Sequence, residues 1–103
     1  MASGKIQRSI GERFQIAFDN NNTAQLPTEL RNSKFIVFVF RRYGYLCSYT
    51  VPTYFINQGT AKNGITAMAD LTRYITFKVD SSLPVTIVDN TIGANTVEGY
   101  GIY

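Results

Sequence analysis

The segment 34–52, KFIVFVFRRYGYLCSYTVP, decides the fold class of this chain of 103 residues. It holds two apolar runs of strand length, Phe35–Arg41 and Tyr45–Val51, separated by a short turn that contains Gly44. Two such runs joined by a few residues with a glycine are typical of a β-hairpin. Because Phe35–Phe40 is apolar on both faces, we expect it to be a central strand, or one covered by another subunit.

The turn of this hairpin allows two registers. If Gly44 takes the left-handed bulge position of a three-residue loop, Val39 lies opposite Cys47. A loop of two or four residues instead places Phe40 opposite Cys47. In either register alternate side chains of the second strand share a face, which we assign to the core. Those side chains are Tyr45, Cys47, Tyr49 and Val51.

Shorter strand patterns recur along the rest of the chain. Phe14, Ile16 and Phe18 occupy alternate positions, as in a strand with one inward face. The turn-forming run Asp19–Asn22 ends that strand. Further short segments of strand character are Gly4–Ile10, Thr53–Ile56 after Pro52, Tyr74–Val79, Val85–Val88 and Val97–Tyr103.

Helix is expected at one place only, a single turn over Leu26–Leu30 that begins at Pro27. Seven Tyr, seven Phe and many β-branched residues favour strands. We find neither an internal repeat nor a linker, so residues 1–103 form one domain. The sequence predicts an all-β fold, an antiparallel β-sandwich of jelly-roll type with about seven to eight short strands and at most one short helical turn.

The residues needed for common enzyme chemistry are missing from the chain. It contains no histidine, which removes the commonest general base and zinc ligand. Cys47 therefore has no histidine partner, and we expect a buried, unreactive thiol. The seven acidic residues fall mostly at predicted turns, and no phosphate-binding glycine motif occurs. We predict no catalytic residue, metal site or cofactor.

The charge and hydropathy patterns argue against membrane insertion and secretion. The longest apolar run, Phe35–Phe40, is closed by Arg41 and is far below the roughly 20 residues of a membrane helix. The first twenty residues show no signal-peptide pattern. A formal net charge of +3, without a basic block, makes nucleic acid an unfavoured partner. We expect a soluble protein.

Arg41, Arg42 and Tyr43 form a candidate binding site at the hairpin tip, with Tyr45 nearby. Basic and aromatic groups together can stack on bases or sugars and attract phosphate. The plainer interpretation is that both arginines solvate the hairpin end while Tyr45 packs inward. If the site is functional, an alternative function is a small OB-like barrel that binds single-stranded nucleic acid through this hairpin.

Several strands together resemble the small jelly-roll modules of tailed-bacteriophage virion proteins, of the tail-fibre, baseplate or receptor-binding type. The similarity lies in the strand pair 34–40 and 46–52, in Tyr74–Val79, and in the ending VEGYGIY of residues 97–103. The resemblance implies a virion location, frequent trimers, and attachment to another virion protein or to a host-surface ligand. Outside a virion we expect a cytoplasmic protein. The chain lacks tryptophan, a common platform for sugars, so glycan binding is not implied.

The two apolar faces of Phe35–Phe40 and the apolar closing strand also predict a homo-oligomer. The resemblance to phage modules favours a trimer over a dimer. A monomer remains the alternative, with the chain's own strands and Leu26–Leu30 covering both faces. The residues expected at the oligomer interface are Phe35, Val37, Val39, Tyr100, Ile102 and Tyr103.

Overall fold

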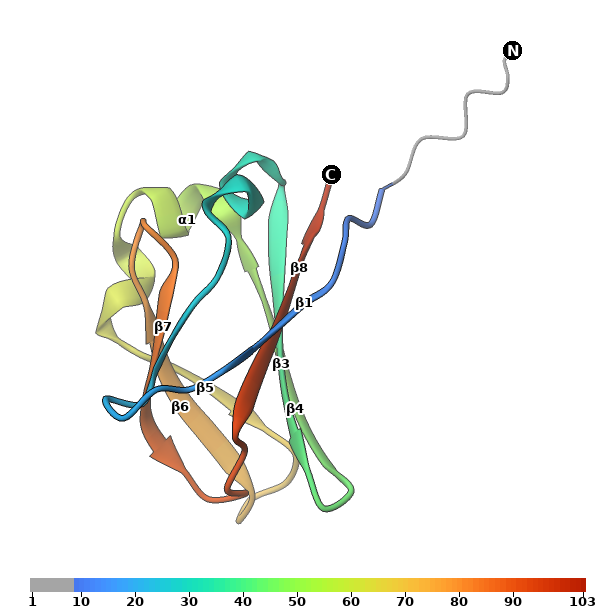
Figure 1. The fold of residues 1–103 in the computed structure, drawn as a ribbon, viewed down its shortest axis with the longest axis vertical. Helices are drawn as coiled ribbons and strands as arrows, with labels where there is room; N and C mark the ends of the chain where they lie inside the picture. The colour runs from blue at the N-terminus through green and yellow to red at the C-terminus, as the bar shows by residue number, and fades with distance from the viewer. Residues whose placement is uncertain (1–8) are drawn as a thin grey trace.

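Two four-stranded antiparallel sheets pack face to face in the computed structural model, which describes residues 9–103 (Figure 1). Sheet A contains, in spatial order, β1 (Phe14–Ala17), β8 (Thr96–Ile102), β3 (Phe35–Arg42) and β4 (Tyr45–Pro52). Sheet B contains β2 (Thr23–Gln25), β7 (Pro84–Asn90), β6 (Tyr74–Val79) and β5 (Ile65–Met68). The predicted all-β, antiparallel sandwich is therefore confirmed.

The first two and the last two strands of the chain pair with each other in both sheets. The chain crosses between the sheets after β1, β2, β4 and β7. Because β1 pairs with β8 and β2 pairs with β7, the first and last strands form one ribbon that folds over both sheets, as in jelly rolls. The inner strands are simpler: β3–β4 is a hairpin within sheet A, and β5, β6 and β7 follow one another within sheet B.

Within residues 9–103, three short helical segments lie in the crossovers between the sheets. The turn expected at Leu26–Leu30 is a 3₁₀ helix, η1 (Thr28–Asn32), which follows Pro27 as predicted. The strand predicted for Thr53–Ile56 is wrong, because this segment forms α1 (Thr53–Asn57), the single α-helix of the described residues. It begins directly after Pro52 ends β4, and its buried Ile56 anchors it. A second 3₁₀ segment, η2 (Thr60–Asn63), leads into β5.

The core lies between the sheets and is centred on aromatic rings. Phe38 and Phe40 of β3 contact Phe77 of β6, with ring centroids 5.2 and 4.9 Å apart. All three side chains are fully buried. Leu26 and Leu30 are also buried, so the η1 region closes the interior and does not cover an outer face.

The β3–β4 turn has two residues, and the three-residue register with Val39 opposite Cys47 is wrong. Phe40 lies opposite Cys47, and Arg42 opposite Tyr45. Tyr43 and Gly44 both have positive φ, 53° and 82°, as a type I′ turn requires. Such a turn matches the strand twist, which here outweighs the strain of a left-handed tyrosine.

The inward face of β4 is only partly buried. Cys47 and Val51 are in the core and Tyr45 is half-buried, as predicted, but Tyr49 is 45% exposed. The assignment of Tyr49 to the core is wrong. Because β4 is an edge strand, the Tyr49 ring lies at the side of the sandwich, in a hollow that Ile65 of β5 also lines.

The N-terminal strand predicted for Gly4–Ile10 lies mostly outside the described residues. Within them, Ile10 makes an isolated bridge with Ile102 of β8. The inward face predicted for Phe14, Ile16 and Phe18 is confirmed, since all three pack against the core.

Candidate functional site

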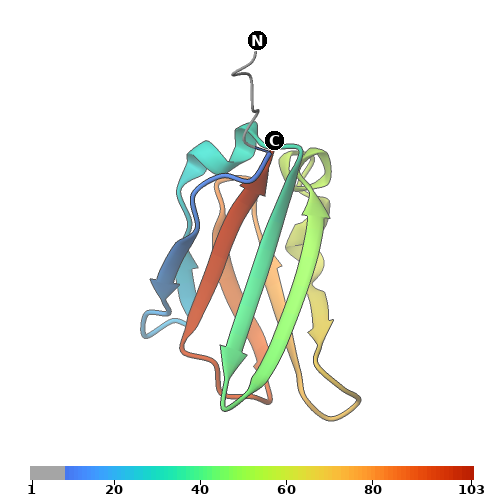
Figure 2. The same ribbon diagram turned by 90° about the vertical axis from the view of Figure 1, so that its right-hand side faces the viewer.

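The outer face of sheet A is the surface of β1, β8, β3 and β4 that points away from sheet B, and Figure 2 is viewed toward it. Residues opposite each other on β3 and β8 place their side chains on the same face. These pairs are Phe35–Ile102, Val37–Tyr100 and Val39–Glu98. Within residues 9–103 no strand or helix covers this face (Figure 2).

Apolar side chains form a row along β3 on the outer face of sheet A, whereas Ser48 and Thr50 lie on the same face of β4. Phe35 is 40% exposed, and Leu46 of β4 is 55% exposed. Val37 is buried although it points outward, since Thr50 and Tyr100 lie beside it on the neighbouring strands. The outer face of sheet A therefore combines an apolar row along β3 with exposed polar side chains on β4.

A buried carboxylate lies at one side of this surface. Glu98 is only 2% exposed, and its Oε2 accepts a hydrogen bond of 2.6 Å from Nε of Arg41. Nε of Arg13 lies 3.6 Å from the other carboxylate oxygen. Both arginine side chains are more than half exposed, so their stems cover Glu98 while their guanidinium groups reach solvent. The charge of Glu98 is thus paired, and two arginines border the apolar surface.

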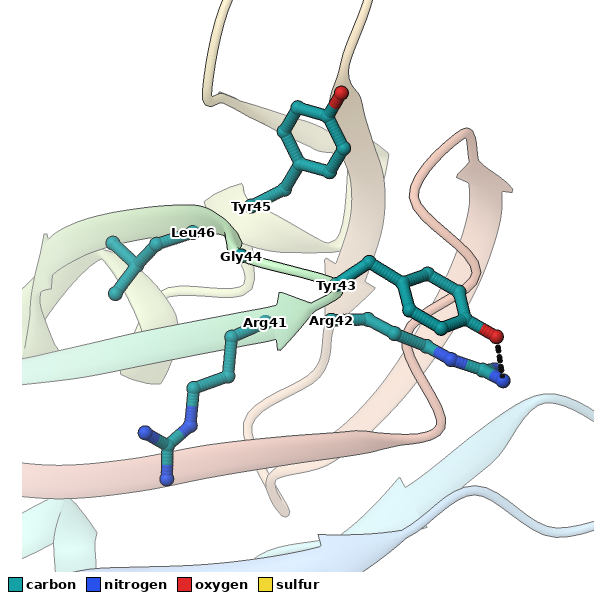
Figure 3. Close-up of a pocket in the computed structure, with 6 residues that line it drawn as sticks. All are labelled: Arg41, Arg42, Tyr43, Gly44, Tyr45 and Leu46. Atoms are coloured by element: carbon teal, nitrogen blue, oxygen red, sulfur yellow. Dashed lines mark hydrogen bonds between the residues drawn. The ribbon is translucent and has the colours of Figure 1, made fainter.

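The hairpin tip does not gather its basic residues into one site. Arg41 and Arg42 are successive residues of β3, so their side chains leave opposite faces of the sheet (Figure 3). Nη1 of Arg42 donates to the carbonyl oxygen of Gly93 at 2.7 Å, and Nη2 donates to the Tyr43 hydroxyl at 2.6 Å. The Arg42 guanidinium also lies 4.5 Å from the ring centroid of Tyr43. Arg42 and Tyr43 therefore bind each other, while Arg41 belongs to the outer face.

Five of the six residues predicted for an oligomer interface lie together on the outer face of sheet A, namely Phe35, Val37, Val39, Tyr100 and Ile102. Tyr103 does not join them. Its ring lies against Gly11 and Gly101, where a Cβ would approach it within 2.7 and 3.1 Å. The sequence analysis missed Leu46, Glu98 and Arg13, although alternation along β4 and β8 would have placed the first two once the register was known.

A polar hollow of about 550 Å³ lies between the β1–β2 and β7–β8 loops. Asp19 and Asn90 line it, but both hold their own loops. Asp19 accepts hydrogen bonds from the backbone of Asn21 and Thr23, and Asn90 exchanges two hydrogen bonds with Ala94. The polar side chains of Asp19 and Asn90 therefore stabilise the two loops that form the hollow.

Cys47 is buried, and removal of its thiol from water raises its pKa above the ordinary value of 9.0, with the charge of Asp70 adding to the effect. No group of three or more Cys, Asp or Glu side chains within residues 9–103 lies close enough to hold a metal ion. None of the helices in that range is long and apolar enough to cross a membrane.

Comparison of the chain with protein-family models, with curated proteins and with solved structures finds no match. Inferences about function therefore depend on the surfaces described above.

Proposed function

We propose that this protein is a non-enzymatic assembly module of the phage-virion type, structural or host-recognising, that binds protein partners through the outer face of sheet A. The observation that carries the proposal is the apolar row of Phe35, Val37 and Val39 on β3, with Tyr100 and Ile102 beside it on β8, which no other described element covers (Figure 2). Contiguous exposed apolar surface with a polar border is typical of protein interfaces.

The border of this face favours a protein partner. Arg13 and Arg41 are held in place by Glu98, and arginine is enriched at protein interfaces because it combines an apolar stem with several donors. The resemblance to tailed-phage modules supports the virion assignment. The expected partners are further copies of this chain, as a trimer, or other virion proteins, with a host-surface ligand as the target of attachment.

Binding of single-stranded nucleic acid is the second candidate, and two observations count against it. The sheets form a sandwich of two layers, whereas the candidate relied on an OB-like barrel. Arg41 and Arg42 also point to opposite sides, so the hairpin offers no continuous basic track. A steep loss of oligonucleotide binding as salt rises would be its signature.

Light scattering over a dilution series tests the main proposal. Phe35→Lys places a charge in the apolar surface and should lower the assembled mass, whereas high salt should leave that mass unchanged. Val88→Lys is the matched control, since Val88 is 57% exposed but lies on β7 of sheet B, away from this face. A mass that stays at 11.6 kDa at every concentration would contradict self-assembly. The same mass for Phe35→Lys and the unchanged protein would contradict the use of this face.

A further inference from the structure

Strand β4 is a long sheet edge, and within residues 9–103 no strand pairs with its outer side, although the α1–β5 segment lies beside its last four residues. Strand β4 pairs only with β3, over eight residues from Tyr45 to Pro52. The other three edge strands of the described residues, β1, β2 and β5, have four, three and four residues. Short edges are one of the ways in which proteins avoid pairing with other chains, and β4 departs from that pattern.

The backbone groups that β4 leaves open can be identified from its register. In the two-residue turn the Arg42–Tyr45 pair exchanges hydrogen bonds with each other, and every second pair along the hairpin does the same. The Lys34–Thr53 pair, which continues this series just beyond the strands, also makes such a bond, 2.9 Å from the Thr53 N–H to the Lys34 carbonyl oxygen. The N–H and C=O groups of the intervening residues therefore point to the open side. These residues are Leu46, Ser48 and Thr50, and all three are exposed.

The usual protections of an edge strand are missing here. Residues 45–52, YLCSYTVP, contain no charged side chain. The ladder with β3 runs through eight successive pairs without a bulge. The only proline, Pro52, is the last residue of the strand, so it can end a further ladder without interrupting it.

We propose that the open edge of β4 pairs antiparallel with β4 of a second copy of this chain, about a twofold axis at Ser48. Sheet A would then continue through the axis as a sheet of eight strands, twice the four in one copy. The proposal goes beyond the proposed function because the edge is a different surface from the outer face of sheet A. Pairing would make the outer faces of the two copies continuous.

The register follows from which residues can bond. With Ser48 opposite Ser48 of the second copy, Leu46 lies opposite Thr50, and all three open residues of each strand are used. A shift of two residues along the strand would place Pro52, which has no N–H, opposite Leu46. In the shifted register each Leu46–Pro52 pair makes one bond instead of two, whereas in the centred register every pair of open residues makes both of its bonds and Pro52 lies beside the turn.

The chemistry of β4 favours a second copy as its partner. Identical strands related by a twofold axis bring each side chain close to its own kind, which penalises charged strands. Since β4 has no charge, that repulsion is absent. The same pairing places Tyr49, which is 45% exposed, beside Cys47 of the second copy and so covers an aromatic ring that the monomer leaves in water.

Cross-linking through Ser48→Cys tests the axis directly. Opposite residues in a hydrogen-bonded antiparallel pair have Cα atoms about 5.5 Å apart, which is the usual spacing of a disulfide. Mild oxidation should convert this variant to a covalent dimer on a non-reducing gel. The unchanged protein, with only the buried Cys47, and Thr66→Cys on edge strand β5 should both stay monomeric. A Ser48→Cys variant that fails to cross-link overturns the proposal.

Ser48→Pro provides the second measurement. It removes an N–H that makes no bond to β3, so the monomer keeps its ladder while the pairing between copies loses bonds at its centre. Light scattering should show half the mass of the unchanged protein, with an unaltered circular dichroism spectrum. Ser48→Thr keeps the N–H and should keep the mass. If Ser48→Pro unfolds the chain, Tyr49→Lys, which sets a charge beside Cys47 of the second copy and on the face of β4 opposite to the outer face, should lower the mass instead.

These outcomes separate the edge from the outer face. A mass lowered by Phe35→Lys but unchanged in the folded edge variants would support the proposed function and overturn edge pairing. The reverse result would support edge pairing alone. A protein that is monomeric alone, and uses β4 only for a strand of a different protein, would also overturn the pairing of two copies.

Discussion

Gly99 of β8 lies directly against Leu26. A Cβ added at Gly99 would come within 2.8 Å of Cδ1 of Leu26 and 3.1 Å of its Cδ2. The φ angle of Gly99 is not positive, so space and not backbone conformation requires glycine here. The close approach lets the fully buried Leu26 pack onto the inner surface of sheet A.

We predict that Gly99→Ala lowers the free energy of unfolding by about 1–3 kcal/mol, the usual cost of an extra methyl group in a packed core. Urea denaturation followed by circular dichroism measures it. Leu26→Ala in the same chain removes the clash, so the two substitutions together should cost less than the sum of their separate effects. Additive costs would show that Gly99 and Leu26 do not interact.

Arg41 should contribute more than Arg13 to the stability of sheet A. Its Nε is 2.6 Å from the carboxylate of Glu98, against 3.6 Å for Arg13. Arg41→Met keeps most of the apolar stem but leaves a buried carboxylate short of its best donor, at a cost of about 1–3 kcal/mol before screening of the exposed guanidinium reduces it. Chemical denaturation of Arg13→Met should show a smaller loss. Equal losses would contradict the pairing described for Glu98.

Cys47 should react with thiol reagents only when the protein unfolds. Burial raises its pKa above 9.0, so the folded protein keeps the thiol proton at a pH where the unfolded chain loses it. Stability from this group is therefore complete below pH 9.0 and falls as the pH rises through the raised pKa of the folded state. Thiol titration in buffer and in urea compares the two states, with Cys47→Ala as the blank. Rapid labelling of the folded protein would contradict the burial of Cys47.

The β5–β6 turn should loosen in acid. The backbone N–H of Thr72 donates to Oδ1 of Asp70 at 2.8 Å and is the main cause of a pKa below the usual 3.8, helped by the Thr72 hydroxyl and by Arg73. These bonds are present above pH 3.8 and are lost as the pH falls through the lowered pKa. The amide resonances of Thr72 and Arg73 should therefore shift together at low pH. In Asp70→Asn the shift should be absent.

The strands were largely predictable because alternation depends on adjacent residues. Phe14, Ile16 and Phe18 show the period of two, and both runs of the hairpin are apolar enough to be recognised without partners. The turn register was harder to predict, since it depends on whether Tyr43 accepts positive φ, which sterics alone disfavour. Helix α1 was missed because the crossover from sheet A to sheet B bends Thr53–Asn57 into a helical turn, a tertiary requirement that local propensity does not contain.

The outer face of sheet A was predictable only in part, because the alignment of its strands depends on residues far apart in the sequence. Phe35, Val37 and Val39 share a face by alternation, but their alignment with Tyr100 and Ile102 joins residues more than sixty positions apart. Arg41 and Arg42 are adjacent in sequence, which suggested one basic site, although adjacent residues of a strand must diverge. The open edge of β4 could not be inferred before the order of strands in sheet A was known.

The position of β8 between β1 and β3 has a consequence for the synthesis of the protein. A nascent chain can close the β3–β4 hairpin early, but β1 has no partner in sheet A until residues 96–102 have left the ribosome. Until then β1 and β3 lack the neighbour that β8 later provides, and their apolar side chains stay exposed to solvent. Folding of sheet A must therefore follow translation of β8, and the apolar surface of the incomplete sheet is prone to aggregation during that interval.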